Sequence, residues 1–142
     1  MTKKTSLDKK IGDKLKELPR LYERAQGTIK IATDFDSRFF DDKRVKSGIS
    51  KAMENGAKVM FLSESKNIPS WYTGQKEIEI KHTKKLENHL MIIDDRHVRL
   101  EHTHEPLKFG DKAEDVAFIF KDFPKLAERC SQRFDVLWKK AS

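Results

Sequence analysis

The sequence predicts an α/β fold, with a mixed sheet of about six or seven strands and helices on both faces. Two observations support this prediction. Residues 59–62 form an unbroken apolar run, which is typical of a strand covered on both faces. Helical stripes of apolar residues alternate with such runs, and the order strand, helix, strand over residues 28–63 indicates a βαβ unit with parallel strands. No repeat, low-complexity linker or change in composition divides residues 1–142, so we expect a single domain.

The first elements follow from apolar periodicity and from residues that favour helix ends. Apolar residues at three- and four-residue intervals predict a leading helix over residues 7–25, kinked or split at Pro19. The apolar alternation at residues 28–33 predicts a short strand. A second helix is expected to begin at the aspartates of residues 41–42 and to end at the Asn-Gly pair of residues 55–56.

The later elements are mostly strands. Residues 67–74 are rich in turn formers and predict a loop or a short turn of helix, and residues 77–81 alternate as a half-exposed strand does. Residues 87–104 predict a β-hairpin, and residues 116–120 predict the last buried strand. A final helix follows from residue 122, with a proline in its first turn.

The hairpin gathers four side chains of the types that bind ligands. If its turn occupies residues 95–96, residues whose numbers add to 191 face each other. His89 then lies opposite His102, and Glu87 lies opposite His104. Residues two apart on a strand share a face, and directly opposed Cβ atoms lie roughly 5 Å apart, so the four side chains converge. A shift of one residue in this register would send one pair to the other face.

One carboxylate and three imidazoles suit a divalent transition metal such as zinc, nickel, iron or manganese. The same cleft could instead bind an organic or anionic ligand, or form a hydrogen-bonded polar face without any ligand. Asp94 has two interpretations, because it could orient a neighbouring imidazole or simply form the turn. The candidate metal ligands are therefore Glu87, His89, His102 and His104, and Asp94 joins them as a candidate ligand-binding residue.

Polar side chains also follow the two predicted parallel strands. Asp34 and Asp36, with Arg38, come after the first strand, and residues 63–65 (Ser-Glu-Ser) hold the equivalent place after the second. Loops at the carboxyl ends of parallel strands commonly shape ligand sites, so Asp34 could line the same cleft as the hairpin, and the same holds for residues 63–65. The alternative is that these residues only end the strands and begin the next elements.

The hairpin resembles the catalytic region of the phospholipase D-like superfamily. The signature of that family is His-x-Lys, four residues, Asp, and then Gly-Ser-x-Asn on the returning strand. Aligned on residues 91–95, the signature histidine falls on Glu87, the lysine on His89 and the aspartate on Asp94. The Gly-Ser-x-Asn falls on residues 101–104. The βαβ start and the last strand and helix also look like this family, so the resemblance implies a phospholipase D-like fold.

The departures from the signature bear on the reaction. Members of the family attack phosphorus with the signature histidine, forming a phosphohistidine, while lysine and asparagine hold the phosphate. Here Glu87 stands at the nucleophile position, where a carboxylate would repel a phosphate group. Such an eroded signature is similar to the ligand-sensing or dimerising domains of archaeal transcriptional regulators. In that setting the leading helix, within residues 1–26, would be a linker or dimerisation helix, and single-repeat members of the family imply a homodimer.

Composition restricts the partners and the compartment. The net charge of +7 favours anionic partners such as nucleic acid, although lysines spread along the chain equally produce a solvated charged surface. Cys130 is the only cysteine, which excludes an internal disulfide and suits a reducing cytoplasm. A membrane-spanning helix needs about 18 consecutive apolar residues. No apolar run in the sequence approaches this length, so we expect no membrane partner.

These observations favour a catalytically degenerate domain that senses a ligand or regulates transcription in a prokaryotic, archaeal cytoplasm. The competing hypothesis is a phosphodiesterase or nuclease of altered, metal-dependent mechanism, so the sequence leaves open whether the protein is an enzyme. A third possibility is a nucleic-acid-binding module that relies on lysine and arginine. The expected partners are a second copy of the chain, a small-molecule or anionic ligand, and nucleic acid, bound directly or through a separate DNA-binding domain.

Overall fold

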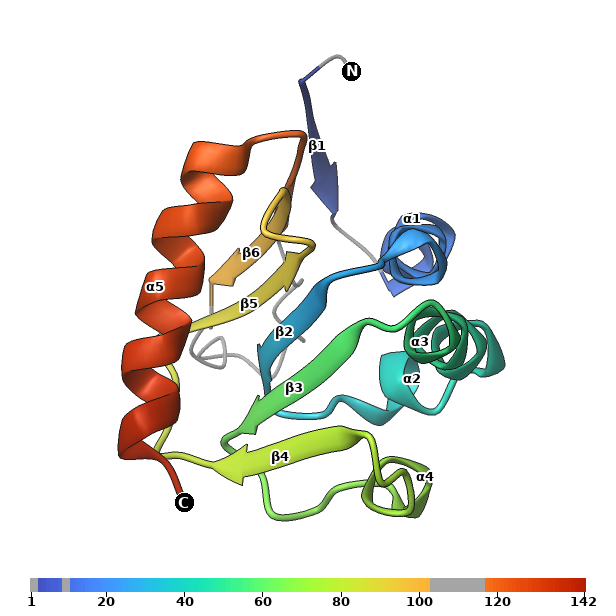
Figure 1. Ribbon diagram of the computed structural model, residues 1–142, viewed down its shortest axis with the longest axis vertical. Helices are drawn as coiled ribbons and strands as arrows, with labels where there is room; N and C mark the ends of the chain where they lie inside the picture. Colours follow the sequence, from blue (N-terminus) through green and yellow to red (C-terminus); the bar gives the residue numbers. More distant parts are fainter. Residues whose placement is uncertain (1–2, 9–10, 103–116) are drawn as a thin grey trace, which may run out of the picture.

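The computed structural model describes residues 3–8, 11–102 and 117–142. Within these residues, seven strands form one mixed sheet in the order β1-β7-β6-β5-β2-β3-β4 (Figure 1). The strands are β1 (Lys4–Asp8), β2 (Thr28–Thr33), β3 (Lys58–Ser63), β4 (Ile78–His82), β5 (Asn88–Ile93), β6 (His97–His102) and β7 (Ala117–Lys121). The helices are α1 (Ile11–Arg24), α2 (Ser37–Phe40), α3 (Lys43–Glu54), α4 (Ser70–Thr73) and α5 (Pro124–Lys140).

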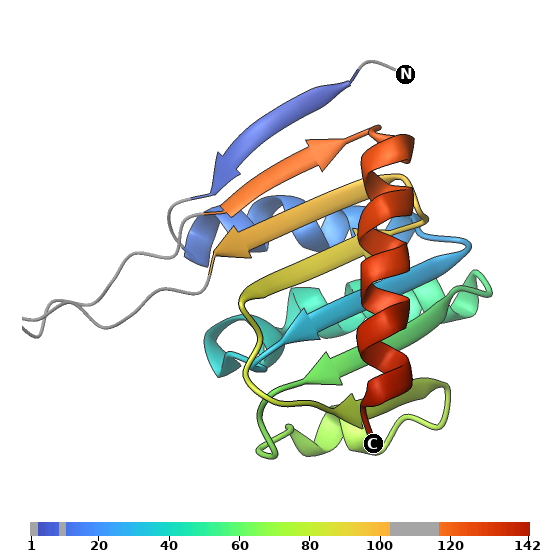
Figure 2. The same cartoon turned by 90° about the vertical axis from the view of Figure 1, so that its left-hand side faces the viewer.

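Helices lie on both faces of the sheet, which confirms the predicted α/β fold. Helix α5 crosses one face, and α1 to α4 lie on the opposite side (Figure 2). Each face has its own apolar cluster, one between the sheet and α1 to α4 and the other between the sheet and α5. The predicted βαβ unit is also present, because β2 pairs parallel to β3, and β4 adds a third parallel strand. The remaining neighbouring strands are antiparallel.

An aromatic cluster anchors the short helix α2 at the carboxyl end of β2. The rings of Phe35 and Phe61 stack with their centroids 4.7 Å apart, Phe40 and Tyr72 pack around them at steep angles, and Phe39 packs against Phe40. The Tyr72 hydroxyl donates a hydrogen bond of 2.6 Å to the carbonyl oxygen of Phe40. This packing fixes the position of the polar residues that follow β2.

Helices α1 and α3 approach each other closely at Gly48. A Cβ atom at this position would lie 2.8 Å from the carbonyl oxygen of Pro19 and 3.3 Å from the Cβ atom of Tyr22. The contact therefore requires a residue without a side chain. Helix α1 runs through Pro19 as one helix, so the predicted split at this residue does not occur.

The leading segment differs from the prediction at its start. Strand β1 pairs antiparallel with β7, with Leu7 opposite Phe118, and the helix begins only at Ile11. Apolar periodicity predicted helix from residue 7, but the backbone groups along the edge of β7 offer hydrogen-bond partners to this segment. Pairing with a distant strand thus overrides the local pattern.

The predicted hairpin is confirmed, but its predicted register is wrong by one residue. Strands β5 and β6 pair antiparallel with His89 opposite Glu101 and Asn88 opposite His102. Facing residues therefore have numbers that add to 190 rather than 191. Because side chains alternate between the two faces of a strand, this shift puts Glu101 rather than His102 opposite His89.

The shift arises because the turn contains three residues, 94–96, rather than two. Asp94 and Asp95 have φ angles of 57° and 50°, in the left-handed region that aspartate tolerates better than most residues. The Asp94 carboxylate also accepts hydrogen bonds from backbone N–H groups at the start of β2. The contact between the turn and this neighbouring segment fixes the longer turn.

Candidate functional site

A cavity of about 220 Å³ lies at the carboxyl ends of β2 and β3, beside the first half of β5. Charged side chains dominate its lining. They come from α1, from the segments that follow β2 and β3, and from the loop and hairpin of β5 and β6: Lys14, Asp34, Asp36, Arg38, Glu64, Lys85, His89, Arg99 and Glu101. The apolar part of the lining includes Phe39, Phe40 and Met91, which belong to the core.

A buried ionic cluster forms one wall of the cavity. Glu101 Oε2 accepts a hydrogen bond of 2.9 Å from Arg99 Nη1, and Lys14 Nζ lies 3.5 Å from the same oxygen. All three side chains are less than 10% exposed. Burial of the Glu101 carboxyl opposes its ionisation, but the charges of Arg99 and Lys14 outweigh burial and lower the pKa of Glu101 below its usual value. Glu101 is therefore a carboxylate neutralised by these two cations.

A second ionic pair lies at the rim. The Asp36 carboxylate accepts hydrogen bonds from the backbone and the guanidinium of Arg38, the shortest at 2.7 Å from Nη2. Partial burial opposes ionisation of Asp36, but the bonds from Arg38 and its charge outweigh this effect and lower the pKa of Asp36. The Asp36 side chain also caps the first turn of α2.

The third group in the cavity combines His89 with two carboxylates. His89 Nε2 lies 2.9 Å from Glu64 Oε1, and both side chains are mostly buried, with exposed fractions of 14% and 16%. The other Glu64 oxygen accepts a hydrogen bond of 2.7 Å from the backbone N–H of Leu86, which fixes the carboxylate relative to the loop before β5. Asp34, Glu64 and His89 each offer one donor atom, and these atoms lie within 4.8 Å of one another.

Of the predicted metal ligands in the hairpin, Glu87 and His89 have described side chains, and these line different cavities. His89 lines the cavity described above, whereas Glu87 lies in the loop before β5 and lines a larger cavity of about 830 Å³ on the side of α5. The backbone of His102 pairs with Asn88, so the predicted pairing of His89 with His102 is wrong. His104 lies outside the described residues.

Asp94 also lies away from the cavity, at the other end of β5. Its carboxylate accepts hydrogen bonds from the backbone N–H groups of Gln26, Gly27 and Thr28, the shortest at 2.7 Å. This arrangement agrees with the turn-forming interpretation of Asp94. It gives no contact with His89 through which Asp94 could orient an imidazole.

Sequence reasoning found part of this site and missed part of it. Asp34 and residues 63–65 were expected to line a cleft because they follow parallel strands; Asp34 and Glu64 do, whereas Ser63 and Ser65 are not among the lining residues. Arg99 and Glu101 were missed as cavity residues because the wrong register placed them on the other face. The correct register would have identified Glu101 as the partner of His89, since the two pair directly.

No protein-family model and no curated protein matches this sequence. Solved structures do match. NucT from Helicobacter pylori has a TM-score of 0.75 at 16% identity, and the match covers 99% of this chain and 98% of NucT. Nuc from Salmonella typhimurium, described as a phospholipase D family member, has a TM-score of 0.68 at 13% identity, covering 99% of this chain and 97% of that one.

TrmBL2, described as an archaeal chromatin protein with a novel mode of DNA binding, has a TM-score of 0.72 at 19% identity. The match covers 97% of this chain but 53% of TrmBL2, so this chain corresponds to about half of that protein. Among the described residues, we find no helix whose length and apolar character would allow it to cross a membrane.

These likenesses extend over nearly the whole chain, and they include a protein described as a phospholipase D family member and part of a protein described as binding DNA. At such low identities they establish the fold rather than the reaction. They agree with the mixed seven-stranded sheet and with the resemblance of the hairpin sequence. The protein therefore has the phospholipase D-like fold.

Proposed function

We propose that residues 1–142 form a catalytically degenerate phospholipase D-like domain that binds a small ligand and acts as a regulatory module in transcription control. The observation that carries this proposal is the chemistry around His89. Where the family signature has a lysine to hold phosphate, this chain has His89. Its imidazole is hydrogen-bonded to Glu64, and Asp34 lies close by. The signature histidine is replaced by Glu87, which lines the other cavity.

The charges of the cavity do not suit the phosphohistidine reaction. Two of its cations, Arg99 and Lys14, contact Glu101, and a third, Arg38, contacts Asp36. The carboxylates beside His89 would repel an incoming phosphodiester. The cavity can instead recognise a small molecule through a mixed set of hydrogen-bond donors and acceptors.

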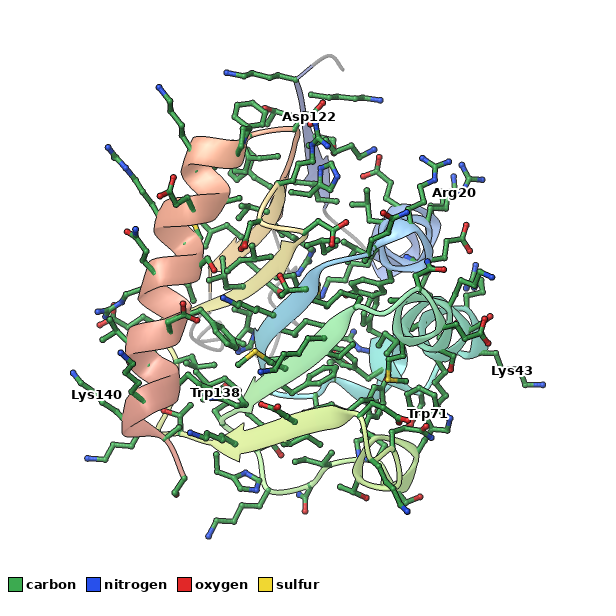
Figure 3. All side chains as sticks on the ribbon, viewed as in Figure 1. Arg20, Lys43, Trp71, Asp122, Trp138 and Lys140 are labelled. Carbon is green, nitrogen blue, oxygen red and sulfur yellow. The ribbon has the colours of Figure 1, made fainter. Side chains whose placement is uncertain are left out.

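The regulatory setting is supported by the likeness to TrmBL2, whose description states that it binds DNA. We propose that this domain acts in the cytoplasm, as a homodimer, in concert with a DNA-binding domain. Basic side chains point outward on both sides of the sheet: Arg20 and Lys43 from the neighbouring helices α1 and α3, and Lys140 from α5 on the opposite side (Figure 3). This spread favours indirect action over a nucleic-acid-binding surface concentrated on one face.

A hydrolysis assay tests the loss of catalysis. The purified chain is incubated with single-stranded DNA, double-stranded DNA and bis(4-nitrophenyl) phosphate, with and without EDTA. We expect no cleavage above the rate of a His89→Ala control. Cleavage that EDTA leaves intact and that His89→Ala abolishes would contradict the proposal.

The second candidate function is a phosphodiesterase or nuclease of altered, metal-dependent mechanism. It is favoured by the grouping of Asp34, Glu64 and His89, which are residue types found in metal-dependent hydrolases. In the same assay it predicts cleavage that EDTA abolishes and that added Mn²⁺ or Zn²⁺ restores.

Two further measurements test the binding and assembly parts of the proposal. A thermal-shift screen with sugars, nucleotides and carboxylic acids should find a ligand that raises the melting temperature of the wild-type protein. Glu64→Gln should weaken that effect. Size-exclusion chromatography with light scattering should give the mass of a dimer, and a monomer at micromolar concentration would contradict the proposed homodimer.

A further inference from the structure

We propose that Asp34, Glu64 and His89 together bind one divalent transition-metal ion. The three residues come from neighbouring strands, since Asp34 follows β2, Glu64 follows β3 and His89 lies on β5. This ligand set differs from the hairpin set that the sequence suggested, with which it shares only His89. The inference concerns the same cavity as the proposed ligand site and deepens that proposal.

The geometry of the three donor atoms suits a single ion. Zinc lies about 2.0–2.2 Å from its nitrogen and oxygen ligands, so donors around one ion lie roughly 3–4 Å apart. His89 Nε2 and Glu64 Oε1 are 2.9 Å apart, and one donor atom from each of the three residues lies within 4.8 Å of the other two. Asp34 is exposed, so a small rotation of its side chain can complete the set.

The charges of the group also favour a cation. Asp34 forms no hydrogen bond or ion pair with any other described residue, although its carboxylate lies close to that of Glu64. Two carboxylates and one imidazole therefore meet at this end of the cavity. A divalent ion would attract both carboxylates and accept the imidazole nitrogen at the same time.

One carboxylate is already held in the orientation that a metal ligand needs. The backbone N–H of Leu86 donates to Glu64 Oε2, which leaves Oε1 directed at His89. Such outer hydrogen bonds to ligating side chains are typical of metal sites in proteins. The neighbouring cations Arg99 and Lys14 contact the Glu101 carboxylate. This carboxylate partly neutralises their charge and so weakens their repulsion of the proposed ion.

The donor types indicate which ions should bind. One imidazole and two carboxylates suit Zn²⁺, Co²⁺, Mn²⁺ or Fe²⁺, whereas Ca²⁺ and Mg²⁺ prefer oxygen ligands throughout. Three protein ligands leave at least one coordination position open. The cavity has room for water or for an oxygen atom of a small ligand at that position.

Calorimetric titration tests the site directly. The wild-type protein is freed of metal by dialysis against a chelator and then titrated with ZnCl₂ and, separately, with CoCl₂. We expect one ion per chain, with ligand-field absorption bands for bound Co²⁺, and little heat with MgCl₂. His89→Ala and Asp34→Asn should each weaken Zn²⁺ binding at least about tenfold, since even outer-sphere partners commonly contribute that much.

Glu87→Gln is the matched control. It removes the hairpin carboxylate that lines the other cavity, so it should leave Zn²⁺ affinity unchanged. Melting curves of metal-free samples establish that each variant is folded, and Asp34→Asn changes only an exposed side chain. A Zn²⁺-induced shift of the His89 imidazole signals in an NMR spectrum gives a second measure of the same contact.

Three results would overturn the proposal: no stoichiometric Zn²⁺ binding by the wild type, binding that survives both His89→Ala and Asp34→Asn, or an equal loss in Glu87→Gln. These outcomes are separate from the failure of the proposed function. Metal binding is measured without hydrolysis or transcription, and a protein without metal can still respond to the small-molecule screen.

Discussion

The backbone N–H of Gly27 donates a hydrogen bond of 2.7 Å to the Asp94 carboxylate, although the two residues lie 67 positions apart in the sequence. The same carboxylate accepts from the neighbouring N–H groups of Gln26 and Thr28. A single side chain in the β5–β6 turn therefore joins the end of α1 to the start of β2. In the family signature this position holds the conserved aspartate, and here its contacts are structural.

Asp94→Ala should destabilise the protein by about 1–3 kcal/mol, because it leaves several backbone donors without their acceptor. Asp94→Asn should cost less, since one oxygen acceptor remains. Urea unfolding followed by circular dichroism measures the difference. Asp95→Ala is the matched control, because Asp95 also has a positive φ angle but is exposed. Equal destabilisation by the two alanine variants would show that the backbone conformation, not the carboxylate, is responsible.

Gly48→Ala should destabilise the protein by about 1–3 kcal/mol through overpacking, although alanine favours helix more than glycine does. The added Cβ would lie 2.8 Å from the backbone oxygen of Pro19, and a backbone atom cannot move aside as a flexible side chain can. Ser47→Ala changes the adjacent, exposed residue of α3 and should be neutral or slightly stabilising. Thermal unfolding of both variants checks this, and a Gly48→Ala variant as stable as the wild type would contradict the close approach of α1 and α3.

Glu101→Gln should destabilise the protein by about 3 kcal/mol at pH 7, because it leaves Arg99 and Lys14 buried without their carboxylate. Glu79→Gln, which breaks an exposed pair with Lys58, should cost less than about 1 kcal/mol. The effect should depend on pH. Since folding lowers the pKa of Glu101, its stabilisation is present above the unfolded-state pKa of about 4.5 and is lost as the pH falls through the folded-state value. The free energies of unfolding of the wild type and of Glu101→Gln, measured by urea denaturation, should therefore become similar in acid.

The order of the elements could be predicted from the sequence because it depends on local patterns. The apolar run within β3, the alternation in β2 and the Asn-Gly pair after α3 are signals that neighbouring residues carry by themselves. Strand β1 could not be predicted in this way, because its stability depends on the exposed edge of β7, more than a hundred residues later.

The site could be predicted only as far as it depends on chain position. His89 was expected to face a ligand, and the strand ends correctly indicated Asp34 and Glu64. The partners across the hairpin were assigned wrongly because the turn length depends on a contact between Asp94 and Gly27 that no local pattern reveals. Because the turn has one residue more than expected, His89 pairs with Glu101 rather than with His102. The residue opposite His89 is therefore a carboxylate and not an imidazole.

His97 provides a prediction about pH in the neutral range. Its Nδ1 atom accepts a hydrogen bond of 3.0 Å from the backbone N–H of Asp122, which requires an imidazole without a proton on that nitrogen. Burial lowers the pKa of His97, and although the charge of Asp122 acts in the opposite direction, it does not cancel this effect. The neutral imidazole therefore stabilises the fold above the unfolded-state pKa of about 6.5, and this contribution is lost as the pH falls through the lower folded-state value.

His97→Asn tests this explanation, because the asparagine side-chain oxygen can accept the same hydrogen bond but does not titrate. The wild type should lose stability between about pH 7 and pH 5 more steeply than the variant, as measured by urea unfolding at several pH values. The two should be most alike above pH 7, where the imidazole is neutral in both the folded and the unfolded chain. Parallel curves across this range would mean that a group other than His97 causes the pH dependence. The charges of Asp94, Arg96 and Lys121 also act on the pKa of His97, but they are the same in the wild type and the variant.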